Sequence, residues 1–135
     1  MKLFDVHFTN KEGKELKARY CCVDKSQARR LFFSEAKEGE NLQKVTEVLK
    51  CTELQKGRQV VFKVDVYRTG NKQVFDGTVL WVNEERKTVT VSYLEGYKDR
   101  SDDIPFEDML AAYDKYGEEM TFDGVRGKSV VLVAE

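Results

Sequence analysis

The sequence predicts an α+β protein in which an N-terminal β-β-α-β lobe, residues 1–54, packs on a small antiparallel β-barrel within residues 55–135. Apolar residues first recur at every second position, then at the spacing of a helix, and then at every second position again. From Lys56 onward the helical spacing disappears, and alternating segments follow one another with short polar turns between them. The 135 residues suffice for one compact unit, with one core or with two small cores that share an interface.

The chain begins with a predicted antiparallel hairpin. Phe4, Val6 and Phe8 alternate with polar residues, which indicates a half-buried strand and places His7 away from the core. Residues 9–13 are rich in turn formers, and a second alternating segment follows them. The apolar positions of this second strand are Leu16, Ala18, Tyr20 and Cys22.

A helix and a third strand complete the predicted lobe. Asp24 is a favourable N-cap residue, and Gln27 three residues later fits the reciprocal capping of a first helical turn. Gly39 is placed to end this helix. The apolar face of the helix comprises Ala28, Leu31, Phe32 and Ala36, and the third strand is predicted from Val45, Val48, Leu49 and Cys51.

The C-terminal half reads as a meander of three strands, at residues 60–66, 74–82 and 88–94. A meander with a single apolar face must curl to bury that face, so a small barrel is the economical solution. Pro105 biases Ile104 toward an extended conformation and is compatible with a helical turn over residues 106–113. A last strand is predicted at residues 130–133, pairing with either lobe.

Composition excludes several classes of protein. Hydrophobic residues make up 41% and charged residues 35%, which is typical of a globular chain, and no apolar run approaches the roughly 20 residues that span a bilayer. The charged start lacks the apolar stretch of a secretory signal, so we expect a cytoplasmic protein. Three cysteines cannot all pair within the chain, and reduced, buried thiols are expected.

No catalytic or cofactor site is predicted. The single histidine, His7, lies on an outward strand face, and no nucleophile elbow accompanies it. One histidine and no second Cys-x-x-Cys pair cannot supply four zinc ligands. The phosphate-cradling loop and the dinucleotide fingerprint are both missing. We therefore expect a protein that is not an enzyme and uses no cofactor or metal.

Charge is nearly balanced, with 11 basic and 9 acidic residues in 1–54 and 12 and 15 in 55–135. Neither half has the strongly basic balance that phosphate-backbone binding usually shows. Basic residues do outnumber acidic ones just after the predicted boundary between the two lobes. The candidate nucleic-acid contacts among them are Lys56, Arg58, Lys63, Arg68 and Lys72. A solvated strand edge guarded by lysines explains the same residues.

An acidic group follows later in the chain, at Asp99, Asp102, Asp103, Glu107 and Asp108. It has neither the glycine nor the ligand spacing of a divalent-cation loop, so a solvated acidic surface is the favoured interpretation.

Residues 56–110 resemble a Tudor domain, one of the small five-stranded, Src-homology-type barrels. The likeness consists of Lys56-Gly57, the segment 75–79 (Phe-Asp-Gly-Thr-Val), the stretch 88–97 and the closing segment 104–110. Tudor domains commonly hold a methylated cation in a cage of aromatic rings, whose faces attract it. The resemblance implies that Tyr67, Phe75, Tyr93 and Tyr97 would form such a cage, with Asp99 where the family often has an amide. Core packing of the same rings, and of Trp81, is the alternative.

The sequence thus favours a non-enzymatic interaction module that binds a protein or nucleic acid through a small β-barrel, with no membrane contact and no small-molecule cofactor. The second hypothesis is an accessory protein of a phage or mobile element that inhibits a host enzyme by direct binding. Carboxylates on a compact scaffold can occupy a basic groove, which makes this second function physically reasonable.

Overall fold

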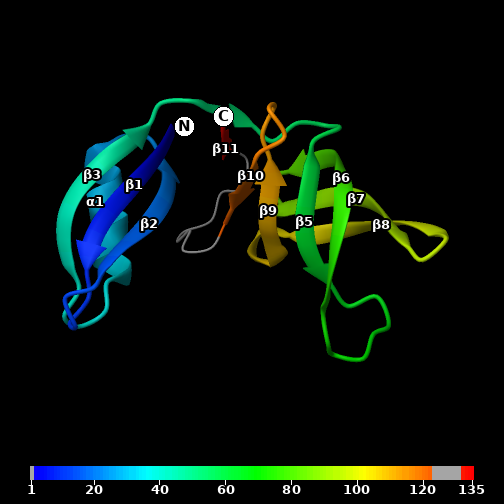
Figure 1. The fold of residues 1–135 in the computed structure, drawn as a ribbon, viewed down its shortest axis with the longest axis horizontal. Coiled ribbons are helices and arrows are strands. Elements are labelled where there is room, and N and C mark those ends of the chain that lie inside the picture. Colours follow the sequence, from blue (N-terminus) through cyan, green and yellow to red (C-terminus); the bar gives the residue numbers. More distant parts are fainter. Residues whose placement is uncertain (1, 123–131) are drawn as a thin grey trace.

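The computed structural model describes residues 2–122 and 132–135, and it is an α+β arrangement in which antiparallel strands predominate. The strands form three sheets, of three, six and two strands, and the described part of the chain contains a single α-helix (Figure 1). The α+β class predicted from the sequence is therefore confirmed.

The three-stranded sheet carries the helix on one face. Its strands β1 (Lys2–Thr9), β2 (Glu15–Cys22) and β3 (Asn41–Val48) lie in the order β2-β1-β3, and α1 (Lys25–Glu35) contacts all three. β1 and β2 form the predicted hairpin. The rings of Phe8 and Phe32 lie 5.1 Å apart between sheet and helix. This face is buried because Phe4, Val6 and Phe8 of β1 project to the same side, whereas buried Leu3 projects to the other side. Its core comprises Phe4, Val6, Phe8, Ala18, Tyr20, Cys22, Ala28, Phe32 and Val45.

The cap of α1 follows the prediction with one difference. The Asp24 side chain accepts a hydrogen bond from the Gln27 amide at 2.8 Å, as expected for an N-cap. The Gln27 side chain accepts from the amide of Val23, one residue before the position that the reciprocal capping arrangement requires. The Asp24 side chain thus satisfies one orphan amide of the first turn, and the Gln27 side chain ties that turn to the residue before the cap.

The predicted third strand is divided in two. β3 ends at Val48, Leu49 is exposed, and β4 (Cys51–Glu53) pairs with β11 (Leu132–Ala134). The last described strand therefore pairs across the predicted boundary at residue 54. Residues 130 and 131 of the predicted last strand lie outside the described residues.

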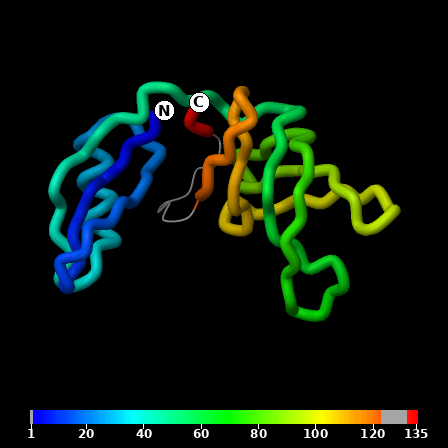
Figure 2. Tube along the Cα trace, viewed as in Figure 1, coloured from blue at the N-terminus to red at the C-terminus, as the bar shows by residue number. Residues whose placement is uncertain are grey.

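The six-stranded sheet contains the predicted meander. Its strands lie in the order β10-β9-β5-β6-β7-β8, with bounds β5 (Gln59–Val64), β6 (Gln73–Asn83), β7 (Thr88–Glu95), β8 (Lys98–Pro105), β9 (Met109–Tyr113) and β10 (Glu119–Thr121). β7 and β8 cross β5 and β9 steeply (Figure 1), and the trace in Figure 2 shows the long loop between β5 and β6. This curl lets one face of a single sheet surround its own core.

The closed barrel and the long helical turn were predicted incorrectly. The sheet is not closed, because no strand pairing joins β8 to β9 or β10 among the described residues. The helical turn is limited to η1 (Phe106–Asp108), after which the chain enters β9. In β9, Ala111 and Ala112 pair with Val61 and Val60 of β5. This pairing between strands overrides the helical preference that Pro105 and the residues after it indicate.

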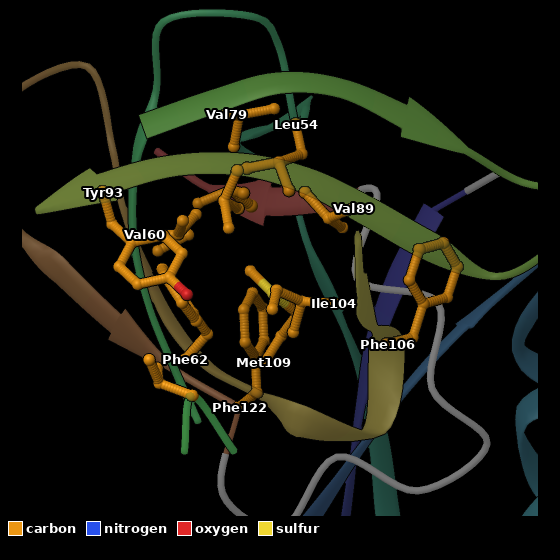
Figure 3. Packing of buried hydrophobic residues seen from close by; sticks show 14 residues of the cluster. Leu54, Val60, Phe62, Val79, Val89, Tyr93, Ile104, Phe106, Met109 and Phe122 are labelled. Carbon is orange, nitrogen blue, oxygen red and sulfur yellow. The ribbon is translucent and has the colours of Figure 1, made fainter. Parts of the chain in front are cut away.

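The core of the six-stranded sheet lies on one face, which we call the inner face (Figure 3). This core contains side chains from five of the six strands, from the connection between β4 and β5, and from β11. Its members are Leu54, Val60, Phe62, Val66, Val79, Val89, Val91, Tyr93, Ile104, Phe106, Met109, Ala112, Phe122 and Val133. The prediction that the two lobes pack on each other stays a prediction.

Candidate functional site

The face opposite this core, which we call the outer face, is defined by the register of β5 to β8. Residues paired across neighbouring strands project to the same side. Val60, Gly77 and Tyr93 are aligned on the inner face, so Gln59, Thr78 and Ser92, aligned one position away, belong to the outer face. The outer face of β6, β7 and β8 is largely polar and also carries the exposed side chains of Trp81 and Leu94.

A pocket of about 470 Å³ opens on this outer face. We call it the outer-face pocket; it is lined by Gln59, Phe75, Asp76, Gly77, Thr78, Ser92, Tyr93, Leu94 and Asp99. Asp76 and Asp99 are both exposed, and neither carboxylate has an ion pair among the described residues. Leu94 is 61% exposed and is the aliphatic member of the lining. The pocket therefore presents two carboxylates, hydroxyl groups and one aliphatic side chain.

Three rings pack behind this pocket on the inner face. The Phe75 and Tyr93 centroids lie 5.1 Å apart with an interplanar angle of 49°, and Phe62 meets Tyr93 edge-on at 5.2 Å. Tyr93 is only 4% exposed. The ring of Tyr93 thus belongs to the core, whereas half-buried Phe75 packs at its margin. Phe62, which sequence reasoning did not select, supplies the third ring because β5 and β6 pair it with Phe75.

The phenol of Tyr93 has polar partners. Its hydroxyl donates a hydrogen bond to the carboxylate of Asp102. Burial, reinforced by that carboxylate, raises the pKa of Tyr93 to about 12. Arg100 lies in register with Tyr93 on β8 and forms an ion pair with Glu95 at 3.6 Å. A cation of the protein itself therefore lies beside the predicted cage.

The predicted cage residues are only partly brought together. Phe75, Tyr93 and Asp99 line the outer-face pocket, whereas Tyr67 and Tyr97 are exposed and do not line it. Tyr67 lies in the β5–β6 loop, and Tyr97 lies at the tip of the β7–β8 hairpin. The two loop residues are the ones whose positions no strand register determines.

A bulge determines the position of Trp81. Strict alternation from Val79 would send Trp81 into the core, but the register of β6 shifts between these two residues. Trp81 consequently pairs with Thr90 of the outer face and is 59% exposed, while Val82 packs against the core instead. Core packing of Trp81 is therefore excluded.

The predicted nucleic-acid contacts do not form one free basic surface. Arg58 donates to the Tyr113 carbonyl and pairs with Glu135 at 3.3 Å. Lys72 pairs with Asp108 at 2.7 Å, and this bond raises the pKa of the Lys72 ammonium. Lys56, Lys63 and Arg68 remain, and they lie before β5, within β5 and in the loop after it.

The predicted acidic group is likewise distributed among different partners. Asp102 binds Tyr93, Asp103 accepts a hydrogen bond from Thr90 and Asp108 pairs with Lys72. Within residues 2–122 and 132–135, no group of three or more potential ligands is arranged to hold a metal ion. Asp99 is the member of this group that lines the outer-face pocket.

The described helix is neither long nor apolar enough to cross a membrane. The chain matches no protein-family model, no curated protein and no solved structure.

Proposed function

We propose that the protein is a non-enzymatic interaction module that binds a partner protein at the outer-face pocket of the six-stranded sheet. The observation that carries this proposal is that β6 and β8 bring Asp76 and Asp99 to one pocket, beside the exposed side chain of Leu94. A partner segment with a basic side chain next to an apolar one complements this lining, because opposite charges orient the encounter and apolar contact adds affinity.

The charges favour a protein over a nucleic acid as the occupant of this pocket. Carboxylates repel phosphates, and both Asp76 and Asp99 are exposed without a compensating ion pair within residues 2–122 and 132–135. Of the basic residues nearby in sequence, Arg58 and Lys72 do not offset them, since both already pair with carboxylates of the chain. Trp81, on the same outer face, is of the residue type most enriched at the energetic centres of protein interfaces.

The resemblance to a Tudor domain extends this proposal to a methylated cation as the basic group. The feature that supports it is the tilted pair of Phe75 and Tyr93 rings at the wall of the pocket. A methylated ammonium would have to approach the Tyr93 ring from the pocket side, because the other side of this ring packs in the core. An unmodified basic side chain needs only the carboxylates.

The proposal can be tested by titrating the ¹⁵N-labelled protein with a Lys-Leu peptide and, separately, with free trimethyl-lysine. Binding at the pocket predicts shifts of the Thr78, Ser92 and Leu94 amide signals. The variants Asp76→Asn and Asp99→Asn should each weaken peptide binding about fivefold, which corresponds to the ~1 kcal/mol of an exposed ion pair.

The matched control is Glu85→Gln, which removes one charge from the β6–β7 turn, outside the pocket. Equal weakening by all three variants would indicate only a general charge effect, and shifts confined to other strands would refute the site. Selective shifts with trimethyl-lysine would extend the proposal to methylated partners.

A second candidate function uses the same face. Asp99 and Asp103 lie four positions apart on the edge strand β8, about 13 Å along it at the usual strand rise. Such an edge suits an inhibitor that occupies the basic groove of an enzyme acting on nucleic acid. Competition between the protein and an oligonucleotide for one captured enzyme would favour this function, whereas simultaneous binding would refute it.

A further inference from the structure

Helix α1 carries an exposed surface of basic and aromatic side chains. Lys25, Arg29 and Phe33 are spaced four residues apart and so lie along one helix face, with Arg30 beside them. All four are exposed, whereas Ala28 and Phe32 of the same helix are buried. We call Lys25, Arg29, Arg30 and Phe33 the α1 surface.

The three cations of the α1 surface have no ion pair among the described residues. The neighbouring carboxylates have other roles: Asp24 caps the helix, and Glu35 accepts a hydrogen bond from Tyr20 at 3.3 Å. The charges of the α1 surface are therefore free for an outside partner.

The stability of the helix does not explain this arrangement. Lys25 lies in the first turn, which contains no acidic residue, so its charge meets the positive end of the helix dipole. Lys25 and Arg29, four positions apart, also repel each other. Both effects weaken α1, which makes a contact outside the helix the better physical reason for these residues.

Phe33 is the apolar member of this surface. Its ring is 63% exposed and meets Phe32 edge-on, with the centroids 5.5 Å apart and an interplanar angle of 66°. The ring therefore rests on the core at one edge and stands open beside the arginines.

We propose that the α1 surface binds single-stranded nucleic acid, with phosphates on the cations and a base stacked on Phe33. Separate cations around one open ring are the arrangement that single strands require, because an unpaired base offers its face while the flanking phosphates need positive charge. An anionic membrane suits the surface less well, since the apolar side of α1 is buried against the sheet and only one ring remains to insert.

The test measures fluorescence anisotropy of a labelled oligo-dT and a labelled oligo-U with the full chain, over a salt series. Replacing Arg29 and Arg30 together by alanine should reduce the slope of log affinity against log salt by about 1.4, since each phosphate contact on a single strand contributes about 0.7. Phe33→Ala should weaken binding about tenfold and leave the slope unchanged, because stacking is not ionic.

The matched control replaces Lys56 and Lys63 by alanine, which removes the same charge from β5 and the segment before it. Unchanged binding by this control and the two distinct losses above would support the proposal. An unchanged slope in the arginine variant, a larger loss in the lysine control, or binding to phosphatidylserine vesicles with none to either oligonucleotide would overturn it. Far-UV circular dichroism establishes that each variant is folded, and Phe33→Leu provides an apolar but non-stacking replacement.

Discussion

Replacing Gly77 by alanine should destabilise the six-stranded sheet, because the structure leaves no room for a methyl group at this position. A Cβ atom there would lie 2.7 Å from the Ser92 carbonyl oxygen, 2.8 Å from the ring of Phe62 and 3.2 Å from the Cβ of Tyr93. The carbonyl belongs to β7, and moving it would disturb the pairing of β6 with β7. The glycine is thus required for close strand contact behind the outer-face pocket.

The expected magnitude follows from two opposing effects. Overpacking of this kind costs about 1–3 kcal/mol. Replacing glycine by alanine also reduces the conformational entropy of the unfolded chain, which stabilises the folded state by about 0.4–1 kcal/mol. Gly77 does not have a positive φ, so backbone strain does not cancel this stabilisation. The free energy of unfolding should therefore fall by about 1–2 kcal/mol.

Urea denaturation followed by far-UV circular dichroism measures this loss. With a slope of about 1–3 kcal/mol per molar urea, the midpoint should fall by roughly 1 M while the slope stays constant. Ser92→Ala, which keeps the carbonyl, should have little effect. Adding Phe62→Leu to Gly77→Ala relieves only the ring contact, so it should not restore the midpoint. A midpoint that is unchanged or higher in Gly77→Ala would refute the packing argument.

Three further predictions concern single groups. Because the pKa of Tyr93 is raised to about 12, the folded state retains the phenolic proton to a higher pH than the unfolded state does. This contribution to stability is present below about pH 10 and is lost between about pH 10 and 12; a Tyr93→Phe variant whose stability falls as steeply in this range would contradict it. Asp24→Ala should lower the free energy of unfolding by about 1 kcal/mol in a thermal or urea melt, and Asp24→Asn, which keeps a capping oxygen, should change it little. Cys51, which is half-buried, should react with a thiol reagent before Cys22, whose pKa is raised by burial; equal rates in the native protein would be inconsistent with this order.

The sequence supported part of the candidate site. The likeness of residues 56–110 to a Tudor domain selected Phe75, Tyr93 and Asp99, and all three line one pocket. The resemblance implied these residues through the motif positions that they occupy. Asp76 was present in the same motif but was not selected, although its place beside Phe75 put it on the opposite, outer face.

Other members of the site depended on contacts between strands. Phe62 meets Tyr93 only because β6 aligns Phe62 with Phe75. Asp102 accepts from Tyr93 because β7 and β8 pair in a particular register. Charge counting also could not foresee that Arg58 and Lys72 would be neutralised by residues 77 and 36 positions away in the chain.

By itself, the sequence determined the α+β class, the first hairpin, the capped start of α1 and the three-strand meander, since these follow from periodicity and from side chains close to one another in the chain. The tertiary structure alone decided three other features: the open edge of the six-stranded sheet, the pairing of β4 with β11 and the outward turn of Trp81. The physical reason is that strand pairing and bulges depend on backbone hydrogen bonds, for which every residue offers an acceptor and every residue except proline a donor. Such bonds leave little trace in residue identity, so only the folded chain shows which strands they join.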